Sequence, residues 1–161
     1  MAIEIERKFE VLGDLWRQEV GRTIEMRQGY LGTEGGRASV RVRIQGDQAR
    51  LNIKAAVVGA TRAEYDYPIP LADGQEILDA LSVGGLHKRR HLIERDGVVW
   101  EVDEFLGDNA GLVVAEVELD SADQALVRPS WLGRELTDDR RYYNHYLALH
   151  PYRTWSDADR D

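Results

Sequence analysis

Charged side chains recur at every second position of several segments, with like charges two residues apart. Arg41 and Arg43 form one such pair, and Glu116 and Glu118 form another. On a β-strand, residues two apart share a face, and like-charged neighbours repel unless an opposite charge lies between them. The arginine pair therefore predicts a bound anion, and the glutamate pair predicts a bound cation.

One face of the strands predicted below collects both signs of charge. Its cationic members are Lys8, Arg41, Arg43, Lys54, Lys88 and Arg90, and its acidic members are Glu4, Glu6, Glu64, Glu101, Asp103, Glu116 and Glu118. Guanidinium and ammonium groups bind phosphate oxygens, whereas carboxylates are preferred ligands of Mg²⁺ and Mn²⁺. This mixture predicts a nucleotide or an inorganic polyphosphate held by the cations, with divalent metal ions held by the acids.

Alternating apolar and charged residues predict the strands that carry these side chains. The predicted strands are Ile3–Val11, Met26–Leu31, Arg37–Ile44, Ala49–Ala55, Arg62–Ile69, Leu86–Arg95, Val98–Phe105 and Leu112–Leu119. Between them, Gly46-Asp47 and Asp96-Gly97 are typical of tight hairpin turns, because these residues accept a positive φ. Neighbouring strands are therefore expected to run mostly antiparallel.

The face opposite the charges is apolar on most of these strands. A single alternating strand is most simply explained by a solvated outer face, but here long charged side chains fill nearly every position of one face. We therefore predict an α+β protein, a closed antiparallel β-barrel of about eight strands with a charged tunnel inside and helices packed outside. Burying such a tunnel is unfavourable unless it is hydrated or holds an ionic ligand.

Three helices are expected besides the strands. Asp73 and Glu76 have the spacing of an N-terminal capping box, which predicts a helix over 73–83. A similar spacing predicts a short helix within Ser121–Pro129, and Arg140–Leu149 has helical spacing of its large side chains. Helices are thus expected to be the minority element.

Length and composition limit the classes of protein to consider. The chain has 161 residues, a usual length for one domain, which we place at residues 1–153, with a frayed polar tail at 154–161. Its 29 acidic and 21 basic residues give a formal charge of −8, which argues against binding of duplex nucleic acid. The chain has no cysteine, and its apolar runs are too short for a membrane span or a signal peptide. We expect a cytoplasmic protein.

A series of short motifs runs along the chain. They are Glu4-x-Glu6-x-Lys8, Gln28-Gly29-Tyr30-Leu31, Arg41-x-Arg43, Lys54, Glu64-Tyr65, Lys88-x-Arg90, Asp103-x-Phe105, Glu116-x-Glu118 and the segment Thr137–Asn144. In this order and spacing, from residue 3 to about residue 150, the chain resembles the CYTH domains, also called triphosphate tunnel metalloenzymes. The resemblance implies a tunnel of eight antiparallel strands, which agrees with the fold predicted from alternation.

The resemblance also implies roles for individual residues. Substrate phosphates would be bound by Lys8, Arg41, Arg43, Lys54, Lys88, Arg90 and Arg140. The family's metal-binding acids fall on Glu4, Glu6, Glu116 and Glu118, with Glu64 and Asp103 nearby. Of these we assign Glu6, Glu116, Glu118 and Asp103 to metal, and Glu4 and Glu64, together with Tyr30, to catalysis. Arg140 stands where short bacterial members often have lysine. The compact ammonium group is thus replaced by a planar guanidinium group with several N–H donors.

The activity implied by the resemblance is hydrolysis of a small-molecule polyphosphate with Mg²⁺ or Mn²⁺. Family members include inorganic triphosphatases, thiamine and nucleoside triphosphatases, RNA 5′-triphosphatases and class IV adenylate cyclases. A polyphosphate-binding module without turnover is a further alternative, and a homodimer is left open. The sequence also leaves open whether Glu4 or Glu64 orients the attacking water.

Aromatic residues decide among these substrates. Most tyrosines and tryptophans are expected outside the tunnel, and Tyr142, Tyr143 and Tyr146 are expected to pack in the core, so no platform for stacking a base is predicted. This favours inorganic triphosphate, cleaved to pyrophosphate and phosphate. Trp16 and Trp131 are the remaining candidates for an aromatic wall around thiamine triphosphate.

Overall fold

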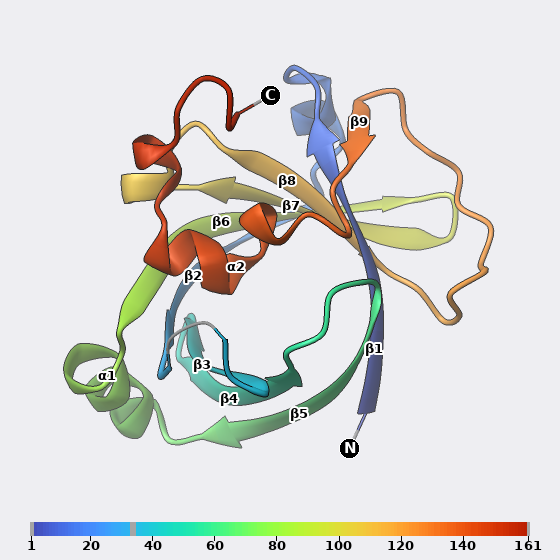
Figure 1. Ribbon diagram of the computed structural model, residues 1–161. Helices are drawn as coiled ribbons and strands as arrows, with labels where there is room; N and C mark the ends of the chain where they lie inside the picture. Colours follow the sequence, from blue (N-terminus) through green and yellow to red (C-terminus); the bar gives the residue numbers. More distant parts are fainter. Residues whose placement is uncertain (1, 33–34, 161) are drawn as a thin grey trace.

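The strands form one closed antiparallel ring in the computed structural model, which describes residues 2–32 and 35–160 (Figure 1). They are β1 (Ala2–Val11), β2 (Arg22–Tyr30), β3 (Ala38–Gln45), β4 (Gln48–Ala55), β5 (Thr61–Ile69), β6 (Gly84–Arg95), β7 (Val98–Phe105) and β8 (Val113–Glu118). Their order is β5-β4-β3-β2-β6-β7-β8-β1, and β5 pairs with β1 to close the ring. The predicted barrel of about eight antiparallel strands is confirmed.

β1 pairs with three other strands. Ala2–Ile5 pair with β5 and Glu6–Glu10 pair with β8, while Phe9 and Val11 pair with a ninth strand, β9 (Leu132–Glu135). β9 was not predicted, because it has only four residues and its glycine interrupts any alternation. It extends the sheet beside β1 without entering the ring.

Two of the hairpins have the turns that the sequence predicts. Gly46 has a φ of 61° between the paired residues Gln45 and Gln48. In the β6–β7 hairpin, Asp96 and Gly97 have φ values of 52° and 79°. Two consecutive positive φ values match a type I′ turn, whose twist fits the flanking strands.

The helices differ from the sequence-based expectation at their boundaries. α1 (Leu71–Ala80) begins after Pro70, so Asp73 lies within the first turn and the predicted capping box is wrong. No helix forms within Ser121–Pro129, where Gln124 Oε1 instead accepts a bond from the Asp120 amide. Short polar side chains that bond to nearby backbone favour such turns over a helix.

The predicted helix over Arg140–Leu149 is divided in two. Its first part is a 3₁₀ turn, η3 (Arg140–Tyr142), and its second part is α2 (Asn144–Leu149). Tyr143 separates them with an extended backbone (φ −74°, ψ 141°). The remaining 3₁₀ turns are η1 (Leu15–Glu19), η2 (Gly107–Asn109) and η4 (Tyr152–Thr154).

The main hydrophobic core, which we call the outer core, is formed by the face of β1, β6, β7 and β8 that points away from the tunnel. It consists of Phe9, Trp16, Ile93, Trp100, Val102, Ala115, Val117, Leu119, Trp131 and Leu132. A second cluster packs α2 through Leu147 against Leu86 of β6 and Phe105 of β7. The outer core therefore lies outside the ring, as predicted, whereas the second cluster takes in apolar side chains on the charged face of the strands, such as Phe105, which pairs with Lys88. In the described part of the chain, no helix has the length and apolar character needed to cross a membrane.

The end of the chain contacts the second cluster. The Trp155 ring meets those of Tyr142 and Tyr152, and its Nε1 donates to the His150 carbonyl. Residue 161 lies outside the described part, and both the frayed tail and the domain limits at 1–153 stay predictions.

The contact of α1 with the sheet yields a first prediction. A Cβ atom on Gly74 would lie 2.6 Å from the Ala49 Cβ on β4, so Gly74→Ala should force the helix away from the sheet. In an exposed helix this change stabilises by about 1 kcal/mol, but overpacking here should destabilise the fold by about 1–3 kcal/mol. The same change in an Ala49→Gly background should recover most of that loss in urea unfolding. Equal stability of Gly74→Ala and wild type would contradict the packing.

Candidate functional site

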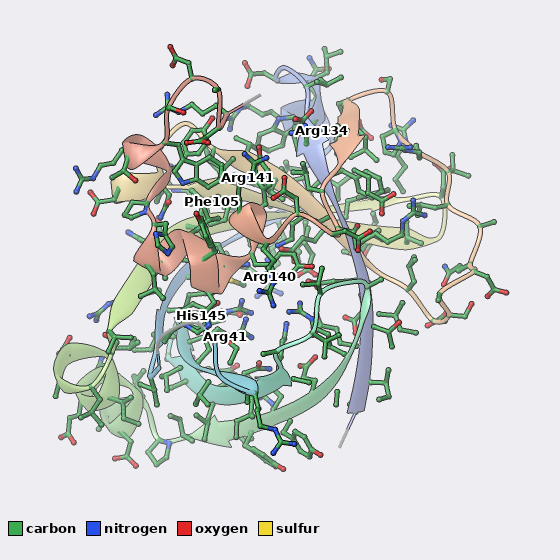
Figure 2. The ribbon with its side chains drawn as sticks, in the orientation of Figure 1. Arg41, Phe105, Arg134, Arg140, Arg141 and His145 are labelled. Carbon is green, nitrogen blue, oxygen red and sulfur yellow. The ribbon has the colours of Figure 1, made fainter. Side chains whose placement is uncertain are left out.

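A cavity of about 610 Å³ opens into the ring beside α2. Figure 2 shows Arg41, Arg140 and His145 around the opening of the ring. The cationic residues that line the cavity are Lys8, Arg41, Lys54, Arg62 and Arg140. Among the described residues of its lining there is no aspartate or glutamate. A chain of formal charge −8 therefore holds a cavity whose charged lining residues, as far as the structure describes them, are all cations.

The lining cations are held from behind by acids of the tunnel. Lys54 Nζ lies 2.7 Å from a Glu4 oxygen, and Lys8 Nζ lies 3.2 Å from a Glu116 oxygen. Burial alone would raise the pKa of Glu116, but the cations around it, Lys8 first, hold that pKa well below its ordinary value. Glu116 and Glu6 raise the pKa of Lys8 despite its burial, so its ammonium group stays charged beside the cavity.

Arg62 is a site residue that the sequence analysis missed. Its Nη2 lies 3.4 Å from Glu6 Oε1, and its buried Nε has no hydrogen-bond partner among the described residues. The signal was present, because Arg62 stands two residues before Glu64 on one strand and must share its face.

Arg41 and Arg43 lie on one face of β3, as predicted. Partial burial, together with the guanidinium groups of Arg41 and Arg90, lowers the pKa of Arg43 to about 9. The buried Arg41 Nε has no partner among the described residues. Unpaired buried donors and crowded like charges both favour the binding of an anion.

Asp103 is completely occupied by neighbouring cations. Its Oδ1 accepts from Arg90 Nε at 2.8 Å, and its Oδ2 accepts from Arg90 Nη2 at 2.9 Å and from Lys88 Nζ at 2.7 Å. Asn144 Oδ1, on α2, accepts a further bond from Lys88 at 3.0 Å. Asp103 is fully buried, so this geometry favours an anchor for Lys88 and Arg90 over the metal ligand that the sequence analysis assigned.

Acidic side chains crowd together on the neighbouring strands β1, β7 and β8. Glu6 stands directly opposite Glu118 in the β1–β8 pairing. Burial and the carboxylates around it, Glu116 first, raise the pKa of Glu6 to about 7. Burial and neighbouring carboxylates also raise the pKa values of Glu101 and Glu118. A bound cation would offset the repulsion among these carboxylates, so this cluster fits a divalent metal.

A complete metal cage is not present before such a cation binds. In residues 2–32 and 35–160, no group of three or more His, Asp or Glu side chains is already arranged around one point. The donor set nevertheless consists of carboxylate oxygens, the ligand type that Mg²⁺ and Mn²⁺ prefer. The metal would have to draw the acidic side chains together.

The three predicted catalytic residues have different environments. Glu4 is ion-paired to Lys54, whereas Glu64 Oε1 accepts a bond from the neutral amide of Asn52 at 3.1 Å and has no ion pair with another described residue. Tyr30 is buried, and its ring stacks on His145 of α2 with centroids 4.4 Å apart and an angle of 6°. Tyr30 and His145 both line the cavity.

Aromatic side chains of the C-terminal segment also reach the cavity, which corrects the sequence-based expectation. Tyr143 and Tyr146 line it, although both were expected to pack in the core. The Tyr143 ring lies 5.3 Å from Lys8 Nζ and 5.3 Å from Arg62 Cζ. Tyr142 is buried as predicted. The sequence missed this wall because the break at Tyr143 turns η3 and α2 in a way that regular helical spacing does not predict.

Trp16 and Trp131 do not contribute to the cavity. Both are buried in the outer core, where Trp131 packs edge-on against Trp100. The suggested aromatic wall of these two tryptophans is therefore wrong.

Known proteins are similar to this chain in fold and in sequence. The CYTH domain model matches residues 2–146. The inorganic triphosphatase of Acetivibrio thermocellus is 40% identical over 158 residues, which cover 98% of this chain and 100% of that protein. The inorganic triphosphatase of Nitrosomonas europaea is 35% identical over 153 residues, which cover 91% of this chain and 97% of that protein. The crystal structure of the inorganic triphosphatase NE1496 has a TM-score of 0.67 and 34% identity, covering 92% of this chain and 96% of that one.

The raised pKa of Glu6 predicts a specific dependence of stability on pH. In metal-free protein the unfolded chain ionises Glu6 near pH 4.5, while the folded protein keeps its proton until about pH 7. Glu6 therefore stabilises the fold fully below pH 4.5, and this contribution is lost as the pH rises to about 7.

Glu6→Gln removes this ionisable group and should make the free energy of unfolding less dependent on pH. In EDTA, the free energy of unfolding of wild type relative to Glu6→Gln should fall by about 2 kcal/mol between pH 5 and 7.5, given about 1.4 kcal/mol per pKa unit. Urea unfolding at several pH values measures this difference. A difference that does not change with pH would show that Glu6 has an ordinary pKa.

Proposed function

Because the chain belongs to the CYTH domain family, we propose that it hydrolyses inorganic triphosphate to pyrophosphate and phosphate inside the tunnel. The observation that carries the proposal is the cavity of about 610 Å³ lined by five cationic side chains and, among its described lining, by no acid. Such a lining suits a compact polyanion. The relatives at 40% and 35% identity are named inorganic triphosphatases, which supports this choice of substrate.

The cations bind the substrate and offset the charge that develops on its oxygens. We assign this role to the predicted residues Lys8, Arg41, Arg43, Lys54, Lys88, Arg90 and Arg140, and add Arg62. Arg41 and Arg62 each present a buried Nε without a partner among the described residues. Arg140 is exposed at the cavity wall, where its planar fork suits a terminal phosphate. Donors fixed before the reaction stabilise the transition state without reorganisation.

Glu6 and Glu118 are the residues that fit Mg²⁺ or Mn²⁺ best. They face each other across β1 and β8, and the pKa of each is raised by burial and nearby carboxylates. Glu116 joins them if Lys8 transfers its contact to a phosphate, whereas Asp103 is fully engaged with Lys88 and Arg90. When bound, the metal supplies charge neutralisation and lowers the pKa of water.

Glu64 is the better candidate for orienting the attacking water. Its carboxylate accepts one bond from the neutral Asn52 amide, whereas Glu4 is neutralised by Lys54. A carboxylate oxygen that is not engaged by an ammonium group can accept a hydrogen bond from a water molecule. We assign to Tyr30 a contact with the phosphate chain, because Tyr30 lines the cavity from β2.

A nucleoside triphosphate is the second candidate substrate. Tyr143, Tyr146 and His145 line the same cavity, which supplies aromatic surface for a base that the sequence did not predict. The cationic set would then bind the triphosphate group in the same way. The homodimer and the cytoplasmic location stay predictions from the sequence.

A phosphate-release assay tests the proposed function. With Mg²⁺ or Mn²⁺ the purified protein should convert triphosphate to equal amounts of pyrophosphate and phosphate, faster than it releases phosphate from ATP. EDTA should abolish the reaction, and pyrophosphate should accumulate. Cyclic AMP as the faster product from ATP would contradict hydrolysis, and a faster release from ATP would favour the second candidate substrate.

Single substitutions separate substrate binding from metal binding. Arg41→Ala and Arg62→Ala should each lower kcat/KM for triphosphate by about 10²-fold, because each removes a donor to developing negative charge. Glu118→Gln should mainly raise the Mg²⁺ concentration needed for half-maximal rate. Arg27→Ala is the matched control, because Arg27 is exposed on β2 and pairs with Asp79 of α1. If Arg41→Ala and Arg62→Ala behave like this control, the cavity is not the active site.

A further inference from the structure

Two buried polar side chains of β2 face the tunnel beside the arginines of β3. Gln28 is 1% exposed and Tyr30 is 3% exposed. In the antiparallel pairing, Gln28 stands opposite Arg43 and Tyr30 stands opposite Arg41. Tyr30 lines the cavity. The sequence analysis gave Gln28 no role.

Gln28 connects Arg43 to Tyr30 by two hydrogen bonds. Arg43 Nε donates to Gln28 Oε1 at 2.9 Å, and Gln28 Nε2 donates to the Tyr30 hydroxyl at 3.1 Å. The direction of this chain is determined by chemistry, because a guanidinium group has no acceptor. The oxygen of the Gln28 amide must therefore face Arg43, and its NH₂ group must face Tyr30.

This direction decides what Tyr30 offers to a ligand. A hydroxyl that accepts from Gln28 points its own proton elsewhere. The Tyr30 ring is also held in place, because His145 stacks on it and His145 Nε2 bonds to the Gly32 carbonyl. The phenol is thus fixed at both ends, and since no described residue accepts from its hydroxyl, its proton can be donated to an acceptor in the cavity.

We propose that Gln28 is a positioning residue that makes Tyr30 a hydrogen-bond donor to the phosphate chain. This inference rests on the proposed function, because ionised phosphate oxygens are acceptors only. Through the same amide, Gln28 holds Arg43 by its Nε and orients the guanidinium group beside Arg41. The neutral side chain of Gln28 thereby determines that Tyr30 donates to the phosphate and also how the Arg43 guanidinium group is oriented.

The test is the penalty of Tyr30→Phe, measured in different backgrounds. The penalty is the ratio of Kd values for triphosphate in EDTA, by titration calorimetry, and the ratio of kcat/KM values with Mg²⁺. In wild type it should be about tenfold or more, the usual loss for a hydrogen bond to a charged group. In Gln28→Glu it should fall to about onefold, because a carboxylate accepts hydrogen bonds from Arg43 and from Tyr30 alike, so the phenolic O–H donates to it instead of to the phosphate.

Two further backgrounds distinguish polarity from a structural role. Gln28→Met takes no proton from Tyr30, so the Tyr30→Phe penalty should persist there. Asn52→Asp adds the same charge opposite Arg41 on β4 without contacting Tyr30, and the penalty should persist there too. If Gln28 had only a structural role, Gln28→Met would raise the Kd for triphosphate at least as much as the near-isosteric Gln28→Glu.

Several outcomes would overturn the inference. One is an unchanged Tyr30→Phe penalty in Gln28→Glu, and another is its loss in Gln28→Met. If Gln28→Glu does not fold, Tyr30→Phe alone is decisive, because a variant that binds triphosphate as tightly as wild type shows that Tyr30 donates nothing. If the wild type binds triphosphate in EDTA but does not cleave it with Mg²⁺ or Mn²⁺, the proposed function is wrong. The Kd ratios then still test the role of Gln28. Absence of binding defeats both.

Discussion

The pairing of β5 with the first residues of β1 is the contact on which the rest of the structure depends. Ala2–Ile5 pair with Thr61–Glu64 and turn an open sheet into a ring. In an open sheet the charged face would lie in water, and its repeated like charges would cost little. In a closed ring the same side chains share one enclosed volume, so each charge must find an opposite charge or a ligand. The apolar faces must then pack outside, where the outer core forms.

The charges inside the ring are only partly matched by one another. Lys88 and Arg90 are neutralised by the fully buried Asp103, and Lys54 by Glu4. Lys8 and Arg62 also contact Glu116 and Glu6, but beyond these pairs the signs separate. The charged side chains in the described cavity lining are cations, while acids crowd across β1, β7 and β8. Such an arrangement lowers stability in the empty protein, because like charges are held close together. The same arrangement accommodates an anion together with a cation, which is the composition of a metal–polyphosphate complex.

The sequence predicts the ring and most of its lining because both depend on a local signal, alternation with a period of two. Arg41 and Arg43, or Glu116 and Glu118, share a face wherever their strand lies. The wall beside the cavity depends instead on tertiary packing. The extended backbone of Tyr143 divides a regular helical pattern, and His145 reaches the cavity only because α2 packs against β2 and β6. The state of each acid is likewise hidden, since nothing in the order of residues shows that Asp103 is enclosed by Lys88 and Arg90.

The ring alone does not complete the site. Lys8, near the start of the chain, donates to the carbonyl of Tyr142, and Lys88 donates to Asn144. His145 Nδ1 bonds to Ser39 of β3 while its ring covers Tyr30. The C-terminal segment contains η3 and α2. Its three consecutive residues Tyr143 to His145 thus contact cationic or aromatic side chains of β1, β2, β5 and β6. Because these contacts are made at the cavity itself, loss of the segment would remove Tyr143, His145 and Tyr146 from the cavity lining, while the pairing of β1 with β5 would still close the ring.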